Sequence, residues 1–438
     1  MAGVQGITKI PELRRRIFFT FFILALVRLG TYIPLPGINA EVLQEYFRAD
    51  TIFGFFNLIS GNALSQMSIL ALGIMPYISA SIIFDLLKVV WPYLKELSQE
   101  GEEGRKKITQ YTRYGTVALS LFQGMMLASL ISRAPAQGGQ SAVMHPGFEF
   151  ILMTMVTLST GTMLLVWLGE QITSRGIGNG ISLIIFAGIA ARIVPNFKQL
   201  FSYVGSTTSS LNMIDVFFIL GFIVLVIAFI VFMERGQRRV PIQYAKRIQG
   251  RRMYGGQSTH LPLKINTSGV IPPIFASSIL TFPNSILQFF TVGFLAMFAS
   301  VMNDPVVFNV VYVGLIIFFC YFYTSIVFNP QEVSDNLKKY GGYIPGIRPG
   351  SMTADYLEQL LNRITFGGAL YISAVCVIPT LFYSAIGSEV AFMGYAFGGT
   401  SVIILIGVAL DTVAQVESHL LSRHYEGFMK QAKMRGRR

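Results

Sequence analysis

The chain has 438 residues, of which 53% are hydrophobic and 13% are charged, and its formal net charge at pH 7 is +12. Its mean hydropathy of +0.56 excludes an ordinary soluble protein of this length and indicates a polytopic membrane protein. The two cysteines, Cys320 and Cys376, lie in apolar runs without CxxC spacing. This placement favours two buried thiols over a disulfide or a zinc site.

Ten apolar segments follow one another along the chain and predict ten membrane-spanning helices. The first, residues 17–33, follows Lys9 and the run Arg14–Arg16, an order that also opens a secretory signal peptide. No small-residue cleavage site comes after it, so we expect a retained first span. The other nine runs cover about residues 67–87, 111–132, 149–170, 180–195, 213–233, 268–290, 306–328, 366–386 and 397–418.

Lysines and arginines are divided unequally between the two sides of these spans. An even number of spans puts both termini on one side, and the tails and loops of that side hold nearly all of the 34 basic residues. The positive-inside rule predicts that this side is cytoplasmic. Topology therefore explains most of the positive charge, and no nucleic-acid partner is needed. The basic residues on or near the other side are Arg28, Arg48, Arg133, Arg192 and Lys198.

The ten spans divide into two halves of five, residues 1–195 and 196–418, followed by a basic tail, residues 419–438. An odd number of spans in each half means that any structural repeat between the halves is inverted. Inverted repeats place functional sites near the midplane, where the halves meet. The sequence support for a repeat is modest: the second and seventh spans share prolines and small residues, MPYISASII against GVIPPIFASSIL.

The second span, Met67–Leu87, is an unusual membrane helix. Gly73 and Pro76 weaken its start, and the small residues 79–81 let a neighbouring backbone approach closely and separate again. The preceding apolar segment, residues 53–66, is interrupted by glycine and asparagine, which predicts a short re-entrant piece buried in protein. Together the two segments indicate a movable part beside a helix–helix contact that can open.

The two longest connections, residues 234–266 and 329–365, lie on the predicted cytoplasmic side. Both combine polar and β-prone residues with Gly and Pro turns, so each is expected to project as a hairpin or finger. The string GIGNG, residues 176–180, lacks a GxGxxG pattern and predicts a turn into the fifth span.

The sequence offers little material for catalysis. It has no HExxH, GxSxG or P-loop motif, and its four histidines lie in loops or at a helix end, so we expect no enzyme, cofactor or metal site. Arg28 and Asp411 lie deepest in the spans, where a structural pair or snorkelling explains them. A substrate-sized polar site around these two residues would instead favour a secondary transporter of small solutes with inverted repeats. A membrane scaffold for ribosomes would use the basic loops without a pore.

Six of the isoleucines, which only the family resemblance given below singles out, lie in four of the spans. In two of these spans a pair lies four residues apart and so shares a helix face. Converging faces would enclose a narrow apolar throat that excludes water and ions by dewetting and still yields to a passing chain. Packing is the commoner role of isoleucine at this spacing, so the pattern alone leaves both interpretations open. The six are Ile78, Ile82, Ile181, Ile185, Ile274 and Ile404.

The chain resembles the SecY family, the central channel subunits of the bacterial Sec protein translocase, over essentially its whole length. The resemblance rests on several separate strings that follow in order along the ten spans. They are TYIPLPGI (31–38), ALGIMPYISASII (71–83), RGIGNGISLIIFAGI (175–189), QGRRMYGGQSTHLPLKIN (249–266), GVIPPIFASSIL (269–280), GIRPG (346–350) and GGTSVIILI (398–406).

The resemblance implies that the two halves form a clamshell around an hourglass pore ringed by the six isoleucines. It implies a plug at about residues 53–70 and a lateral gate between the second and seventh spans, through which apolar helices leave for lipid. The plug residues would be Phe53, Phe55, Phe56, Asn57, Gly61 and Leu64, and the gate residues Ser79, Ser81, Pro272, Ser277 and Ser278.

The resemblance also implies partners. These are the membrane subunits SecE and SecG, the motor ATPase SecA, the ribosome with its rRNA, signal sequences and nascent chains, and the lipid bilayer. Arg251 and Arg252 in the first cytoplasmic loop and Arg348 in the second match positions for contact with the motor or the ribosome. We therefore expect a channel in the plasma (inner) membrane that passes unfolded secretory polypeptides and releases transmembrane helices laterally.

Overall fold

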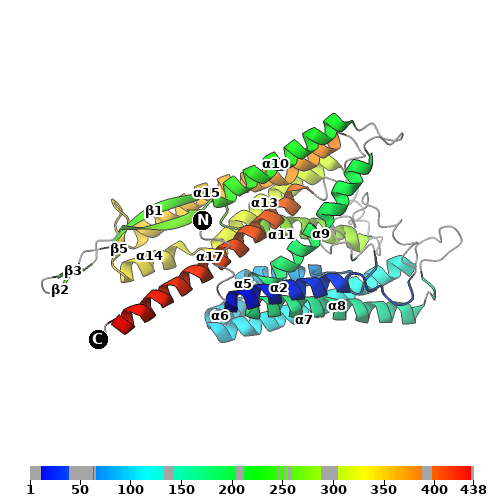
Figure 1. Cartoon of the computed structure of the whole chain (residues 1–438), viewed down its shortest axis with the longest axis horizontal. Helices are drawn as coiled ribbons and strands as arrows, with labels where there is room; N and C mark the ends of the chain where they lie inside the picture. Colours follow the sequence, from blue (N-terminus) through cyan, green and yellow to red (C-terminus); the bar gives the residue numbers. More distant parts are fainter. Residues whose placement is uncertain are drawn as a thin grey trace.

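The computed structural model describes residues 11–38, 63, 66–132, 143–145, 147–203, 212–244, 247–249, 252–254, 258–287, 304–386 and 397–435. These residues form an almost entirely helical protein with two small β-sheets at one end (Figure 1). The expected plug residues Phe53, Phe55, Phe56, Asn57, Gly61 and Leu64 lie outside the described residues, as does Arg251.

Each of the ten predicted apolar runs overlaps a helix, and two shorter helices, α6 and α14, lie between them. The helices are α2 (Pro11–Gly30), α5 (Met75–Val90), α6 (Pro92–Gln99), α7 (Glu102–Ser132), α8 (Phe148–Arg175), α9 (Gly180–Tyr203), α10 (Met213–Arg235), α11 (Ile271–Leu287), α13 (Pro305–Val327), α14 (Pro330–Lys339), α15 (Ser351–Ile386) and α17 (Gly399–Arg435).

Most of these helices can cross a bilayer. Among the described residues, seven helices are long and apolar enough to do so, or eight if the bent pair α5 and α6 is counted as one span. α2 and α11 fall outside this count, because α2 carries the run Arg14–Arg16 and the apolar part of α11 is short, Ile271–Leu280. The all-α polytopic fold is confirmed, and the full number of ten spans stays a prediction.

The second span begins later than the sequence predicts. The expected helix starts at Met67, but α5 starts only at Met75, and residues 66–74 form turns. Gly73 has a φ of +58°, a left-handed conformation that interrupts a helix at little cost for glycine. The N–H of Leu35 donates to the Met67 carbonyl at 2.8 Å, so this segment pairs with the connection after α2 instead of extending α5.

The first long loop is a hairpin, as predicted. β1 (Gln237–Tyr244) pairs antiparallel with β4 (Ser258–Lys264), with Val240 opposite Leu261. Nearer the tip, β2 (Arg247–Gln249) pairs antiparallel with β3 (Arg252–Tyr254).

The second long loop is more helical than a simple finger. The Asn329 side chain accepts from the N–H groups of Gln331 and Glu332 and so caps α14, which begins with a proline that suits a first turn. Only β5 (Gly342–Tyr343) is a strand, and it pairs with β1 in a sheet of order β4-β1-β5. The two loops are therefore one unit with a small core of their own, formed by Val240, Leu263, Ile344, Leu357 and Leu361.

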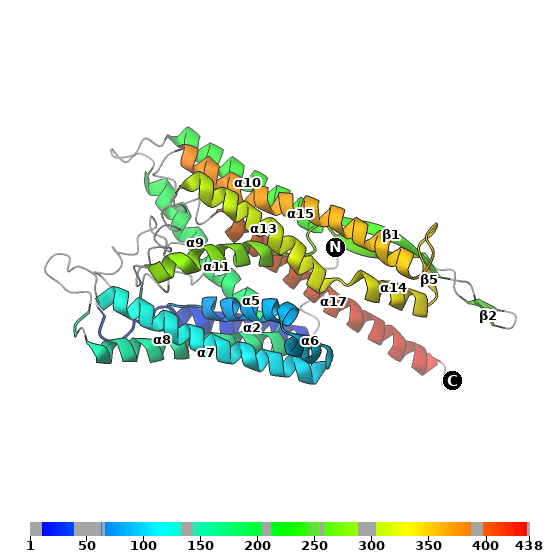
Figure 2. The ribbon, with the colours of Figure 1, turned by 180° about the vertical axis from the view of Figure 1, so that it is seen from behind.

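The helices form two groups that lie side by side (Figures 1 and 2). In one group α5 packs on α7, and α7 and α2 pack on α8; in the other, α13 packs on α11 and α15, and α15 and α10 pack on α17. α9 crosses obliquely between them and contacts α8 and α17, and α5 contacts α11. The predicted boundary at residue 195 falls inside α9, which continues past Pro195 to Tyr203. We call the end that carries β1, α14 and the end of α17 the hairpin end.

Candidate functional site

The six predicted throat isoleucines lie in one continuous apolar core. Ile78 and Ile82 come from α5, Ile181 and Ile185 from α9, Ile274 from α11 and Ile404 from α17, so both helix groups contribute. Five of the six are buried, and Ile181 is partly buried against the same cluster. The cluster also holds many other apolar residues, so a ring around a pore stays a prediction.

A polar cavity of about 490 Å³ lies against this apolar core on the side of the hairpin end. Three of its lining residues sit about one helical turn from a predicted throat residue: Val408 from Ile404 on α17, Ile271 from Ile274 on α11, and Ser182 from Ile185 on α9. In each helix, the residue that lines the cavity lies closer to the hairpin end than the isoleucine does. The remaining lining residues are Asn179, Asp411, Thr412, Ala414, Gln415 and Ser418.

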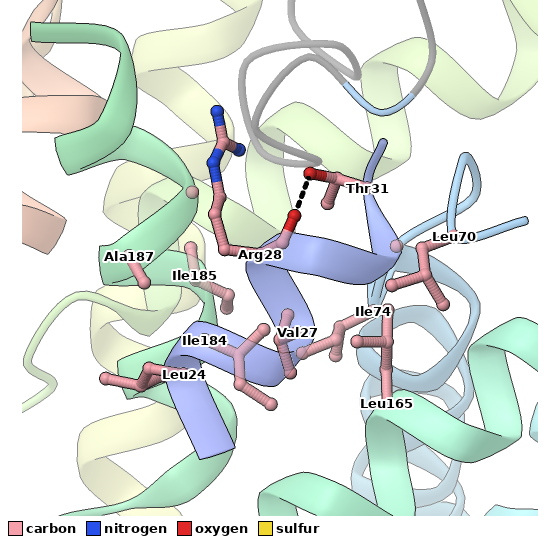
Figure 3. Close-up of a pocket in the computed structure, with 12 residues that line it drawn as sticks. Leu24, Val27, Arg28, Thr31, Leu70, Ile74, Leu165, Ile184, Ile185 and Ala187 are labelled. Atoms are coloured by element: carbon pink, nitrogen blue, oxygen red, sulfur yellow. Dashed lines mark hydrogen bonds between the residues drawn. The ribbon is translucent and has the colours of Figure 1, made fainter. Parts of the chain in front are cut away.

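A second, much smaller cavity of about 30 Å³ lies between α2, α8, α9 and the turns before α5 (Figure 3). Ile185 and Arg28 both line it, and the Arg28 side chain points away from the apolar residues drawn with it. The Arg28 guanidinium lies 5.5 Å from the centre of the Tyr32 ring, a cation–π distance. The volume suits roughly one or two water molecules and no larger solute.

Arg28 and Asp411 do not share a site. Arg28 lines the small cavity, whereas Asp411 lines the polar cavity and is largely exposed, 3.9 Å from the Lys264 ammonium. The substrate-sized polar site that a small-solute transporter would need around these two residues is therefore not formed.

The GIGNG turn joins the two helix groups, a role that the sequence did not reveal. The Gly178 N–H donates to the Gln415 side chain on α17 at 2.9 Å, and the Ile177 N–H donates to the Thr20 hydroxyl on α2 at 3.1 Å. The Asn179 side chain accepts from the Ile181 N–H and caps α9. Because Gly178 has a φ of +88°, this tight turn favours glycine. The turn is predicted correctly, and we call it with its partners the glycine junction.

The predicted lateral-gate residues occupy the two helices that meet across the groups. α5 contacts α11. On α5, Ser79 and Ser81 are partly buried, and on α11, Pro272, Ser277 and Ser278 are buried. The Ser277 hydroxyl donates to the Ile274 carbonyl, one turn earlier in the same helix. Small residues on both helices suit a close approach of α5 and α11.

The predicted partner-binding arginines lie at the hairpin end. Arg348 is exposed in the turn between β5 and α15, and its backbone carbonyl accepts from the Thr353 hydroxyl at 2.8 Å. The Ser334 hydroxyl donates to the Gly350 carbonyl at 2.6 Å, which ties the same turn to α14. Arg252 lies in β3, and the structure does not describe its side chain.

Neither a metal cluster nor a redox site appears among the residues that the structure describes. No group of three or more His, Cys, Asp and Glu side chains in that part of the chain is placed to hold a metal ion. Cys320 and Cys376 are both buried, as their apolar surroundings predict.

Comparison with solved structures identifies the class of protein that this architecture defines. One match is described as the structure of a protein conducting channel, with a TM-score of 0.65, 17% identity and coverage of 92% of both chains. Another is Sec61 in the canine ribosome-channel complex from the endoplasmic reticulum, with a TM-score of 0.62, 16% identity and the same coverage. The fold is that of a protein-conducting channel.

Sequence comparison then identifies the family. The SecY family model matches residues 68–413. The protein translocase subunit SecY of Escherichia coli K12 is 48% identical over 432 residues, which cover 97% of this chain and 96% of that protein. The chain belongs to the SecY family, and these comparisons give no support to the transporter alternative.

Proposed function

We propose that unfolded secretory polypeptides enter the polar cavity at the hairpin end and pass between the six isoleucines to the other side of the membrane. One observation carries the proposal: three helices, α9, α11 and α17, each line the polar cavity and carry a predicted throat residue about one turn farther along. An extended chain meets a polar entrance followed by an apolar constriction. Such a constriction excludes water and ions by dewetting. A polypeptide can still pass, because its side chains displace no bound water there. The segment at about residues 53–70 would close the far side as a plug.

The contact between α5 and α11 serves as the lateral exit. An apolar signal sequence or nascent transmembrane helix is more stable in lipid than in a polar cavity, so it leaves as soon as these helices separate. The small residues of the two helices, Ser79 and Ser81 on α5 and Ser277 and Ser278 on α11, would keep their packing shallow enough to separate and close again.

Partners supply the energy, because the chain has no nucleotide-binding motif and acts as a channel without enzymatic activity. We assign SecA and the ribosome to the hairpin end, where Arg348 is exposed in a turn held by two side-chain hydrogen bonds. Arg251 and Arg252 at the tip of the first loop would contact rRNA phosphates or acidic protein surfaces. SecE and SecG complete the complex in the plasma (inner) membrane, with both termini of this chain cytoplasmic.

The test is export into vesicles that contain this chain, its small membrane partners, SecA and ATP. A signal-bearing unfolded protein should become protected from added protease. Arg348→Glu should abolish this protection and leave the thermal unfolding of the purified chain unchanged, because the side chain is exposed. Lys338→Glu is the matched control, a charge reversal at an exposed position of α14 in the same loop. Normal export by the Arg348 variant would refute the docking assignment, and absence of protected substrate with the unmodified chain would refute the channel.

A further inference from the structure

The span α5 ends in a sharp bend that carries exposed aromatic side chains. Trp91, the residue between α5 and α6, is extended with φ −99° and ψ 111°, and Pro92 begins α6. The two helices are bent by 99° relative to each other. We call residues 89–93 the elbow. It lies at the same end of the molecule as the hairpin (Figures 1 and 2).

The helix that follows the elbow is packed firmly against its own helix group. Leu94 and Leu97 of α6 are buried with Ile108 of α7 in a small apolar cluster. Gly104 on α7 is also buried, and a side chain there would overlap the Leu97 carbonyl, so the two backbones touch. The bend is therefore fixed, because α6 cannot straighten into a continuation of α5 without losing these contacts.

The outer side of the elbow is apolar and exposed. Val89 and Val90 at the end of α5 are 54% and 78% exposed, and Trp91 and Tyr93 are 56% and 53% exposed. Contact of the two valines with water is unfavourable, whereas contact with acyl chains is not. Trp and Tyr side chains suit the boundary between a bilayer and water, because each combines an apolar ring with a polar N–H or O–H group.

The length of α5 indicates why a boundary anchor is needed. Its 16 residues extend about 24 Å at about 1.5 Å per residue, which is less than the bilayer core of about 30 Å. At the other end of α5 the preceding turns are buried inside the protein, with Met67 and Ile74 only 0% and 3% exposed. Length alone thus does not set the depth of α5, and interfacial aromatic side chains are groups that can.

The charges around the elbow do not favour a charged partner. Residues 85–107 contain five basic and five acidic residues, and the Lys88 ammonium lies 2.7 Å from the Asp85 carboxylate. A balanced segment gains little from anionic headgroups, which attract clusters of Lys and Arg. It likewise offers no charge complementarity to a soluble protein. Continuity with the membrane-spanning helix α5 favours lipid as the occupant of the exposed apolar side.

We propose that the elbow is an interfacial anchor that binds the boundary between acyl chains and headgroups. Val89 and Val90 lie among the first acyl carbons, and Trp91 and Tyr93 lie at the level of the headgroups. The anchor sets the depth of α5 and keeps α6 in the plane of the membrane surface. It goes beyond the proposed function, because it holds whether or not α5 borders a lateral exit.

Tryptophan fluorescence tests the proposal directly, because the chain has only two tryptophans, Trp91 and Trp167. The full chain with Trp167→Phe, reconstituted in phosphatidylcholine vesicles, reports on Trp91 alone. Lipids brominated near the headgroup, at mid-chain or near the terminal methyl group quench a tryptophan at the corresponding depth. Trp91 should be quenched most by bromine nearest the headgroup and less by each deeper position.

Two probes in a chain with Trp91→Phe and Trp167→Phe serve as matched controls. Phe318→Trp replaces an exposed side chain near the middle of α13 and should be quenched most by bromine near the terminal methyl group. Tyr340→Trp replaces an exposed side chain at the end of α14 and should be quenched by aqueous iodide and by no brominated lipid. If Trp91 responds like the Tyr340→Trp probe, the proposal is overturned.

Two further measurements distinguish the bilayer boundary from other occupants. Phosphatidylglycerol in place of phosphatidylcholine should leave the order of quenching unchanged, and quenching confined to phosphatidylglycerol would overturn the proposal in favour of a charge-selected lipid site. Addition of tryptophan-free forms of the small membrane partners should also leave it unchanged. Loss of lipid quenching on this addition would assign the elbow to a protein partner and contradict the anchor. Neither measurement depends on export, so the outcome is separate from that of the channel test.

Discussion

The two helix groups meet in two ways that differ physically. At the glycine junction the contact is polar and directional, because backbone N–H groups of a tight turn donate to Gln415 on α17 and to Thr20 on α2. α5 and α11, which also contact each other across the groups, bury mainly apolar or small side chains, such as Ile78 on α5 and Ala276 on α11.

This difference suggests how a clamshell can open on one side only. The hydrogen bonds of the glycine junction are directional. Separation would leave the Ile177 N–H without a partner in a buried site and would expose the Gly178 N–H to water, so the junction resists separation. When small apolar faces separate, they lose only dispersion contacts and buried apolar area, which lipid or a substrate helix can replace. The junction should therefore act as the fixed side and the contact of α5 with α11 as the opening seam.

The largest effect is expected from locking the seam. A disulfide between one cysteine on α5 and one on α11 should abolish insertion of transmembrane helices, because the exit can no longer separate. The matched control joins two helices within one group: Ser120 on α7 and Ser159 on α8 have hydroxyls 2.6 Å apart, and S120C with S159C should leave insertion unchanged. Insertion is measured by carbonate extraction of the product. Normal insertion through the fully crosslinked seam would refute lateral exit there.

The next effect concerns the apolar core between the two contacts. Ile404→Asn places an amide in the predicted throat, where it can hydrogen-bond to water. An amide that stabilises the hydrated throat by about 1.4 kcal/mol should raise the ion conductance about tenfold. Conductance is measured in planar bilayers. Val413→Asn is the control, since Val413 is half exposed farther along the same helix. Unchanged conductance in the Ile404 variant would count against the ring.

The fixed side should lose stability when its acceptors are removed. Thr20→Val leaves the Ile177 N–H without its partner in a buried site and should cost about 1 to 3 kcal/mol. Thr20→Ser keeps the acceptor and should recover most of this loss. The measurement is chemical denaturation of the purified chain in detergent. Equal stability of the Val and Ser variants would show that the hydrogen bond does not hold the turn.

The smallest effect is expected at Gln415, whose side chain is more exposed than Thr20. Gln415→Leu should lower the free energy of unfolding by about 0.5 to 1.5 kcal/mol, because water partly replaces the lost acceptor for the Gly178 N–H. Gln415→Glu retains an oxygen acceptor and serves as the control in the same denaturation assay. A loss in the Glu variant as large as in the Leu variant would contradict the role of the acceptor.

The helices were predictable because long apolar runs have few alternatives to a helix in a membrane. The hairpin of the first loop and the turn at GIGNG were also predictable from local turn residues. The start of α5 was not, because the pairing of Leu35 with Met67 competes with the helix and is invisible in the local pattern.

Long-range polar contacts were the part of the site that the sequence could not provide. Gly178 and Gln415 are separated by 237 residues, and a glutamine on a helix has no signature that names its partner. The joining of both loops in one sheet, through β5 and β1, likewise depends on a two-residue strand too short to detect. Only the family resemblance marks the six isoleucines as a throat, since helical spacing alone does not separate a throat from ordinary packing.

The most direct test of the central claim is to locate a polypeptide arrested during export. A photoreactive amino acid is placed singly at Ile404 in the predicted throat, at Ile274 on α11, or at Phe217, an exposed position of α10. Passage between the isoleucines predicts that the arrested chain crosslinks at 404 and 274 and not at 217. Crosslinking at 217 with none at 404 or 274 would show that the polypeptide takes another route.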